Sequence, residues 1–368
     1  MVLPCLLMPL SSVAGDTLTT WLRSHGGSVS SRVHVATSVP CGGGLGVFAS
    51  SPLSLGEELG TIPLDACITY SDAYASEEEL GKEIRSRLPP DAAFGQASVA
   101  VAALLAYARW AETPGGEAAR KRWGEYVDTL PWEMAEQVAI DGAASFASDS
   151  ALREADASQS EMDAVGGEED LSESVARWRR THVARARGYA AGVQLLLGGR
   201  LPLEACWAAL WLVESRAFDL GPYGGNSCVL VPWLDIFNHP SASALRAHGA
   251  AGAAFASSAS RSAACISWAA ELEKRDDDQG DDNDDGDDGD GGDRAGDGDG
   301  GEELRRARER SRSAPKAIVV RAPRELAVGA GDELWNWYDS AGFGTSSPEE
   351  WARGEAQFLA QYGFSPWD

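Results

Sequence analysis

Residues 230–240 read Leu-Val-Pro-Trp-Leu-Asp-Ile-Phe-Asn-His-Pro, and this stretch constrains the fold more than any other. Its apolar side chains predict a buried position, so Asp235, Asn238 and His239 are expected to lie in or beside a core. A buried polar group without a hydrogen-bond partner costs about 1–3 kcal/mol. The three polar side chains therefore belong either to an internal hydrogen-bonded network or to a site that faces a ligand.

The chain has 368 residues, 44% of them hydrophobic, and a formal net charge of −25. A chain of this length can bury a core large enough for one elaborate domain or for two to three smaller ones. Much of the acidity comes from a run of Asp and Gly, which predicts a disordered acidic insertion over residues 271–315. The acidic balance also argues against a nucleic-acid partner, since such a surface needs clustered Lys and Arg.

The cysteines and histidines are dispersed, without the spacing of a zinc site or of a secreted disulfide framework. We therefore expect no metal, and isolated thiols in a reducing compartment. No apolar run reaches the roughly 18–20 residues of a membrane span. Residues 1–10 are apolar but lack the basic segment of a signal peptide. This weak targeting signal leaves cytoplasm, nucleus and plastid open.

Two kinds of periodicity divide the chain. Short alternating or β-branched segments predict strands at residues 33–36, 59–63, 265–269, 317–321 and 334–338, and residues 41–49 predict a glycine-rich turn that runs into a strand. Apolar residues at helical spacing predict helices at residues 17–27, 97–111, 172–189, 203–218 and 348–361. The helix at 97–111 is apolar nearly all round, which indicates a buried helix. The glycines at 42–46 are not a dinucleotide-binding fingerprint, and turn glycines are their default interpretation.

Six segments, each weak alone, together point to a family. They are residues 43–49 (Gly-Gly-Leu-Gly-Val-Phe-Ala), 123–131 (Trp-Gly-Glu-Tyr-Val-Asp-Thr-Leu-Pro), 215–218 (Ser-Arg-Ala-Phe), 231–239 (Val-Pro-Trp-Leu-Asp-Ile-Phe-Asn-His), 331–338 (Gly-Asp-Glu-Leu-Trp-Asn-Trp-Tyr) and 362–364 (Tyr-Gly-Phe). In this order they resemble the motifs of the SET-domain protein-lysine methyltransferases. The branch they resemble is the one typified by the Rubisco large-subunit methyltransferase.

The resemblance implies an α+β fold, in which a SET-domain β-fold of short strands is interrupted by a large, mostly α-helical insertion. A C-terminal pseudoknot would close the β-fold, a rare arrangement among proteins. The expected parts are a tail that carries the weak targeting signal (1–16), the first part of the SET domain (17–95), the helical insertion (96–215) and the second part of the SET domain (216–368). The helical domain with which this branch grips its substrate is expected to be absent, since the sequence stops four residues after Phe364.

The same resemblance implies that a monomer transfers a methyl group from S-adenosylmethionine to a lysine amine of a protein substrate. Tyr338 would be the catalytic residue, with its hydroxyl orienting the acceptor nitrogen. The cofactor would be bound by Gly43, Gly44, Leu45, Asp235, Asn238, His239 and Phe364. The substrate would be contacted by Arg216, Phe218 and Tyr362.

Two alternative functions stay open, methylation of a histidine and a non-catalytic SET-like module that holds a peptide or the cofactor. Arg216 also has a purely structural interpretation, in which it pairs with Asp235 or Asp219. Tyr362 and Phe364 have a structural alternative of their own, as core residues of the pseudoknot.

The chain departs from the family at two further points. Pro240 replaces the small hydroxyl residue that usually follows Asn-His. The segment between Tyr338 and Tyr362 is unusually long and contains a predicted helix, which bears on which tyrosine is catalytic.

Overall fold

The computed structural model describes residues 12–38, 45–76, 78–146, 171–220, 228–238, 266–271, 317–324 and 327–336. Its helices are α1 (Ser12–Ser24), α2 (Tyr70–Ala75), α3 (Glu79–Arg87), α4 (Phe94–Trp110), α5 (Pro114–Val127), α6 (Trp132–Phe146), α8 (Leu171–Leu196) and α9 (Leu203–Arg216). Two 3-10 turns are η1 (Leu64–Ala66) and η2 (Leu234–Ile236). The strands are β1 (Ser28–Val29), β2 (Val33–Thr37), β3 (Leu45–Ala49), β4 (Glu58–Pro63), β5 (Ile68–Thr69), β6 (Ala217–Phe218), β7 (Val229–Leu230), β8 (Ser267–Glu271), β9 (Ala317–Arg321) and β10 (Glu333–Leu334).

The described strands form three small antiparallel sheets, with the orders β1-β4-β9-β8, β10-β3-β2 and β5-β7-β6. Each sheet combines strands that precede helices α2 to α9 with strands that follow them: β4 pairs with β9, β3 with β10, and β5 with β7. The β-rich part is therefore assembled from segments before and after the helices. This arrangement confirms an α+β fold of short strands with a large helical interruption.

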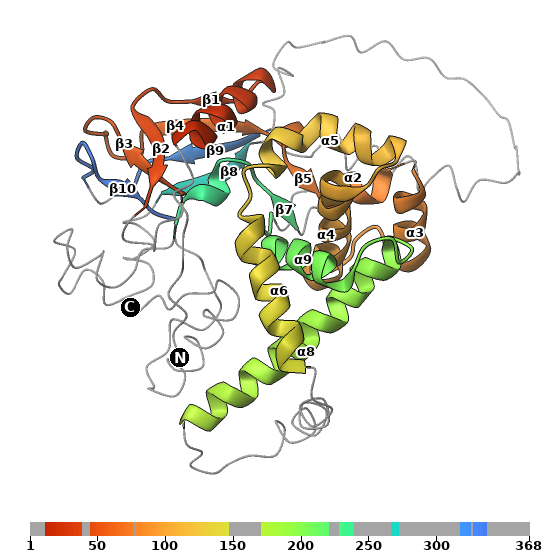
Figure 1. The fold of residues 1–368 in the computed structure, drawn as a ribbon. Helices are drawn as coiled ribbons and strands as arrows, with labels where there is room; N and C mark the ends of the chain where they lie inside the picture. Colours follow the sequence, from red (N-terminus) through yellow and green to blue (C-terminus); the bar gives the residue numbers. More distant parts are fainter. Residues whose placement is uncertain are drawn as a thin grey trace, which may run out of the picture.

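Helices α4 and α9 form the centre of the helical part. Most residues of α4 are buried on every side, as the sequence predicted, because α5, α8 and α9 all pack against it. Figure 1 shows α2 to α9 gathered at one end of the molecule and α1 with most strands at the other. The sheet of β5, β6 and β7 lies between these two groups, and it carries the chain into η2.

Several element bounds differ from those predicted. The helix expected at 203–218 ends at Arg216, because Ala217 and Phe218 pair with β7 as strand β6. The helix expected at 172–189 runs over Leu171–Leu196, and the first helix is Ser12–Ser24 rather than 17–27. The strand expected at 317–321 is observed as β9 with those bounds.

The acidic stretch connects two strands that lie side by side. Glu271 of β8 pairs with Ala317 of β9, so the chain leaves β8 and re-enters β9 at the same end of this strand pair. A long insertion is tolerated at such a place because the cost of loop closure grows slowly with length. The acidic run itself, the C-terminal pseudoknot and the helix expected at 348–361 lie outside the described residues.

Within the described ranges, no helix combines the length and the apolar character needed to cross a bilayer. The same residues contain no cluster of three His, Cys, Asp or Glu side chains arranged to hold a metal ion.

Candidate functional site

The chain turns sharply at Trp233, immediately before η2. Trp233 has a φ of 71°, in the left-handed region that bulky residues adopt rarely and at a cost. Its indole is fully buried and makes an edge-to-face contact with Phe237, with the ring centroids 5.0 Å apart. Gly60 of β4 leaves room for the indole, because a Cβ there would lie 3.0 Å from the ring. Close packing therefore holds this strained turn and fixes the start of the polar loop that follows.

Asp235 lies on this turn as a buried carboxylate, 6% exposed. Its Oδ2 accepts a hydrogen bond of 3.0 Å from the hydroxyl of Tyr126, and Nη1 of Arg216 lies 3.4 Å from the same oxygen. Arg216 also donates to the backbone carbonyl of Asp235 at 3.0 Å. Oδ1 of Asp235 has no hydrogen-bond partner among the described residues. Burial raises the pKa of Asp235, and the Arg216 guanidinium and Tyr126 hydroxyl act in the opposite direction.

Tyr126 reaches this carboxylate from α5, in the helical part of the fold. It is fully buried, and its ring stacks on Trp21 of α1 with the centroids 6.1 Å apart. Burial, and then the neighbouring Asp235, raise the pKa of Tyr126 well above its ordinary value, so the hydroxyl stays protonated and donates. The sequence interpretation gave Tyr126 no role. The available signal was its spacing of three from Trp123, which places both aromatic residues on one helix face.

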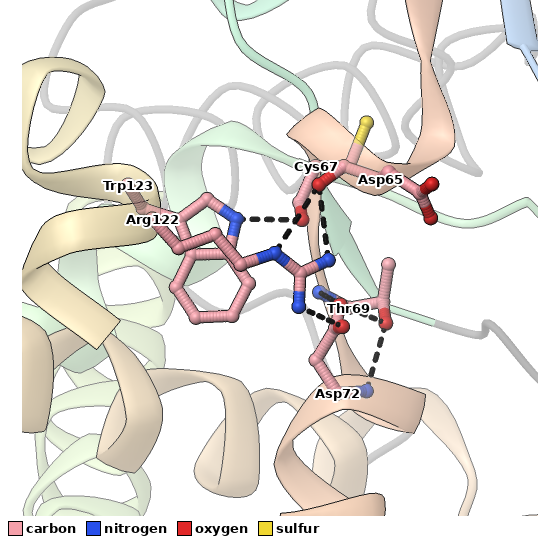
Figure 2. Close-up of polar contacts among 6 residues, drawn as sticks. All are labelled: Asp65, Cys67, Thr69, Asp72, Arg122 and Trp123. Carbon is pink, nitrogen blue, oxygen red and sulfur yellow. Dashed lines mark hydrogen bonds and ion pairs between the residues drawn. The ribbon is translucent and has the colours of Figure 1, made fainter. Parts of the chain in front are cut away.

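Helix α5 is held against the β-rich part through Arg122 and Trp123, as Figure 2 shows. The indole N–H of Trp123 donates to the carbonyl of Cys67 at 3.0 Å. Nη2 of Arg122 donates to the carbonyl of Asp65 at 3.0 Å, and its Nη1 lies 2.9 Å from Oδ1 of Asp72. The guanidinium also covers the Trp123 ring, 4.2 Å from the centroid. These contacts fix α5 beside β5, which pairs with β7, the strand that leads into η2.

Arg216 and Phe218 come from the junction of α9 and β6. Phe218 pairs with Val229 of β7, and its ring makes an edge-to-face contact with Trp268 of β8 at 5.3 Å. This pairing brings the end of α9 to the loop after β7, where Arg216 meets Asp235 with 24% of its own side chain exposed. The predicted pairing of Arg216 with Asp235 is therefore observed. A substrate-binding role for Arg216 and Phe218 stays a prediction.

Asn238 follows η2 and connects three distant segments. Its Nδ2 donates to the carbonyl of Leu45 and to Oε1 of Glu333, both at 2.9 Å. Glu333 also accepts a hydrogen bond of 2.9 Å from the hydroxyl of Ser38. The backbone N–H of Asn336 donates to the carbonyl of Asn238 at 2.9 Å. Leu45 and Asn238, both predicted to bind the cofactor, are thus in direct contact.

Ser38 and Glu333 were missed as members of this site. Both are buried, Ser38 fully and Glu333 to 6% exposed. Glu333 stands in the segment at 331–338 that carried the family resemblance, but an acidic residue after a turn is more often solvated. Only its placement against β3 shows that it is enclosed.

The remaining predicted site residues lie outside the described part of the chain. They are Gly43, Gly44, His239, Tyr338, Tyr362 and Phe364. The described part of the site therefore consists of Leu45, Arg216, Phe218, Asp235 and Asn238 among the predicted residues, with Ser38, Tyr126 and Glu333 in addition.

Two acceptor oxygens of the site, Oδ1 of Asp235 and Oδ1 of Asn238, have no donor among the described residues. Asp235 is a buried acidic side chain of the loop that Asn238 completes, and Glu333 of β10 is a second one, in contact with Asn238. Both hydrogen bonds that the Asn238 side chain makes with described residues use its amide nitrogen. Such a set of groups suits a ligand that carries positive charge and N–H donors.

Neither the protein-family models nor the curated proteins match this chain. Among solved structures, the SET domain of LSMT bound to lysine and AdoHcy matches 97% of this chain, with a TM-score of 0.52 and 16% identity. Two further matches are the SET domain of LSMT bound to methyllysine and AdoHcy (17% identity, 98% of this chain, 57% of that chain, TM-score 0.48) and Rubisco LSMT bound to AdoMet (17% identity, 96% of this chain, 56% of that chain, TM-score 0.49).

The first of these matches shows that the chain has the fold of a SET domain. The particular SET domain that it resembles is that of LSMT, and the chain spans 58% of the length of that structure. The interrupted β-fold and the helical insertion described above agree with this fold class.

Proposed function

We propose that this chain is an S-adenosylmethionine-dependent methyltransferase that acts on a lysine side-chain amine of a protein substrate. The observation that carries the proposal is the direct contact of Asn238 with Leu45, within a SET fold. This contact joins the glycine-rich strand start to the Asn-His loop, the two segments to which the resemblance assigns the cofactor. The LSMT neighbour was solved with lysine and AdoHcy, which supports the same choice of ligands.

The described residues fit a ligand with a cationic amino-acid end. Within the described part of the chain Oδ1 of Asn238 accepts no hydrogen bond, and the buried carboxylate of Glu333 accepts one from the amide nitrogen. Gly46 provides the space for this arrangement, because a Cβ there would collide with Oε1 of Glu333. We propose that Leu45, Asn238 and Asp235 bind the cofactor, together with Gly43, Gly44, His239 and Phe364.

When bound, S-adenosylmethionine supplies a methyl group already activated by its positively charged sulfur. The protein then has to align the acceptor and exclude water, rather than activate the donor. A lysine ammonium has no lone pair, and its ordinary pKa of about 10.4 has to be lowered by an apolar surrounding. Phe218, with Tyr362, is proposed to line that apolar surrounding, while Tyr338 orients the acceptor nitrogen through its hydroxyl. Arg216 is proposed to lie at the edge of the same acceptor site, where it already holds Asp235.

Calorimetric titration of S-adenosylmethionine tests the cofactor assignment. The full chain should bind it, and Asn238→Ala should weaken binding by at least about tenfold, the effect of losing one charge-assisted hydrogen bond. Asn283→Ala, the same change in the acidic run, is the matched control and should bind like the full chain. If the full chain does not bind S-adenosylmethionine, the proposed function is wrong.

Turnover is tested with radiolabelled donor and a cell lysate. A labelled protein band that Tyr338→Phe loses or diminishes supports an enzyme, and mass spectrometry of that band identifies the modified residue. A labelled histidine would replace lysine as the acceptor. Cofactor binding without any labelled band would favour a non-catalytic SET-like binding module.

A further inference from the structure

We infer that Glu333 is a positioning residue that fixes the orientation of the Asn238 carboxamide, so that Oδ1 is the atom presented to a ligand. The ligand it favours is a cationic primary amine, the amino group of an amino-acid end. The part of this inference that concerns the ligand rests on the proposed function. The part that concerns the amide orientation does not.

Glu333 is well placed to hold the amide. It is 6% exposed, and its two oxygens have different partners: Oε1 accepts from Nδ2 of Asn238 and Oε2 from the hydroxyl of Ser38, each at 2.9 Å. The carboxylate is thereby held from a second side by a buried residue at the end of β2. A side chain anchored at both oxygens cannot follow the amide if the amide turns.

The amide itself has one satisfactory orientation. A carboxamide carries two N–H donors on nitrogen and an acceptor on oxygen. In Asn238 the nitrogen faces two acceptors, the Leu45 carbonyl and Oε1 of Glu333. A flipped amide would place its oxygen against both of these oxygens, with no hydrogen between them. Removing Glu333 would leave the Leu45 carbonyl alone to select the orientation.

Glycine at position 46 makes this approach possible. A Cβ on Gly46 would collide with Oε1 of Glu333, and it would lie 3.0 Å from Cβ of Ser38 and 3.1 Å from Nδ2 of Asn238. All three members of the network therefore meet over the one residue of β3 that has no side chain. Gly46 is therefore required for the close approach of Glu333, Ser38 and Asn238.

The network also determines which atoms of Asn238 remain for a ligand. Its backbone carbonyl accepts from the N–H of Asn336 at 2.9 Å, and its amide nitrogen is fully used. Among the described residues no donor reaches Oδ1. An acceptor oxygen beside a buried carboxylate favours a donor with positive charge.

The first test observes the Asn238 amide directly, by NMR with asparagine labelled at its side-chain nitrogen. The sequence has four asparagines, at 226, 238, 283 and 336, and Asn238→Ala identifies the signal. Glu333→Met keeps the approximate volume of the side chain but has no acceptor, and it should speed hydrogen exchange of this amide by about tenfold. Glu333→Gln should exchange like the full chain, since its oxygen can accept from Asn238 while its nitrogen donates to Ser38.

If Glu333→Met does not fold, Ser38→Ala decides the same point, because it releases the carboxylate from its second partner. Faster exchange at Asn238 alone supports the inference. Unchanged exchange at Asn238 in a folded variant overturns it.

The second test compares two ligands by calorimetry. S-adenosylhomocysteine contains the amino-acid end, and 5′-methylthioadenosine has the same nucleoside and sulfur without it. Glu333→Met should weaken the first by about tenfold and leave the second unchanged, while Glu333→Gln restores the first. An equal loss for both ligands would show a merely structural role and overturn the inference. If the full chain binds neither ligand, the proposed function fails, and the amide exchange still decides the role of Glu333.

Discussion

The hydroxyl of Tyr126 donates to Oδ2 of Asp235 at 3.0 Å, although 109 positions separate the two residues in the sequence. The tyrosine belongs to α5 and the aspartate to the loop after β7. This buried hydrogen bond thus joins α5 of the helical part to the loop of residues 231–238. This bond explains why a buried carboxylate can be retained beside an apolar turn, and it leads to the first prediction.

Tyr126→Phe should lower the free energy of unfolding by about 1–3 kcal/mol, because it leaves Oδ2 of a buried carboxylate with one partner fewer. Chemical denaturation measures this loss. Tyr74→Phe is the control, since the hydroxyl of Tyr74 has no hydrogen-bond partner among the described residues, and it should change stability by less than about 0.5 kcal/mol. Equal effects of the two substitutions would contradict the structural importance of the bond.

Arg216→Met should cost about 3 kcal/mol, because it leaves the Asp235 carboxylate buried without its cation. The pKa of Asp235 is raised above its ordinary value by burial, so the contribution of this group is present at low pH and lost as the pH rises. Removing the guanidinium raises that pKa further, and the variant should therefore be more damaged at pH 8 than at pH 4.

Two variants check the Arg216 prediction by denaturation at both pH values. Asp235→Asn in the Arg216→Met background should recover most of the loss at pH 8, because it removes the buried charge. Arg87→Met removes an exposed pair with Glu83 and should have little effect. No recovery in the double variant would show that the cost comes from packing instead.

Trp123→Phe should destabilise the protein by about 1–3 kcal/mol, because it leaves the Cys67 carbonyl without its indole donor inside the core. Trp110→Phe is the matched control, since the indole nitrogen of Trp110 has no hydrogen-bond partner in the described part of the chain. Thermal unfolding of both variants measures the difference. A smaller shift for Trp123→Phe than for Trp110→Phe would contradict the anchoring role of α5.

The raised pKa of Glu214 predicts a second dependence of the free energy of unfolding on pH. Burial raises the pKa of Glu214 from 4.5 to about 7, and Arg185 opposes the shift. The native state then binds its proton more tightly than the unfolded state, so this contribution is full below pH 4.5 and is lost as the pH rises through about 7. Glu214→Gln should therefore be more stable than the full chain by about 3 kcal/mol at pH 8 and similar to it at pH 4.

Denaturant titrations at pH 4, 6 and 8 check the Glu214 prediction. Glu204→Gln, at the exposed start of the same helix, controls for the substitution and should keep the pH dependence of the full chain. An unchanged pH dependence in Glu214→Gln would contradict the assignment of the proton to this residue.

The local pattern of apolar and polar residues was sufficient to predict much of the secondary structure and its burial. The β-branched run of β9 gave its bounds, and the apolar surface of α4 gave its burial, because both depend on side-chain periodicity within one segment. The burial of residues 231–237 was predictable for the same reason. Element ends were less predictable: α9 ends at Arg216 only because the next two residues pair with β7.

The partners of the polar residues were decided by tertiary structure. The sequence predicted that Asp235 and Asn238 belong either to an internal network or to a ligand site. The structure supplies an internal partner for each, Tyr126 and Glu333, and no donor reaches Oδ1 of Asn238 from the described residues. These partners lie 109 and 95 positions away, and hydrogen bonds over such separations depend on how whole elements pack. The sequence by itself thus determined that the loop would be buried and polar. Only the packing of α5 and β10 against it determined which described residues serve as its internal hydrogen-bond partners.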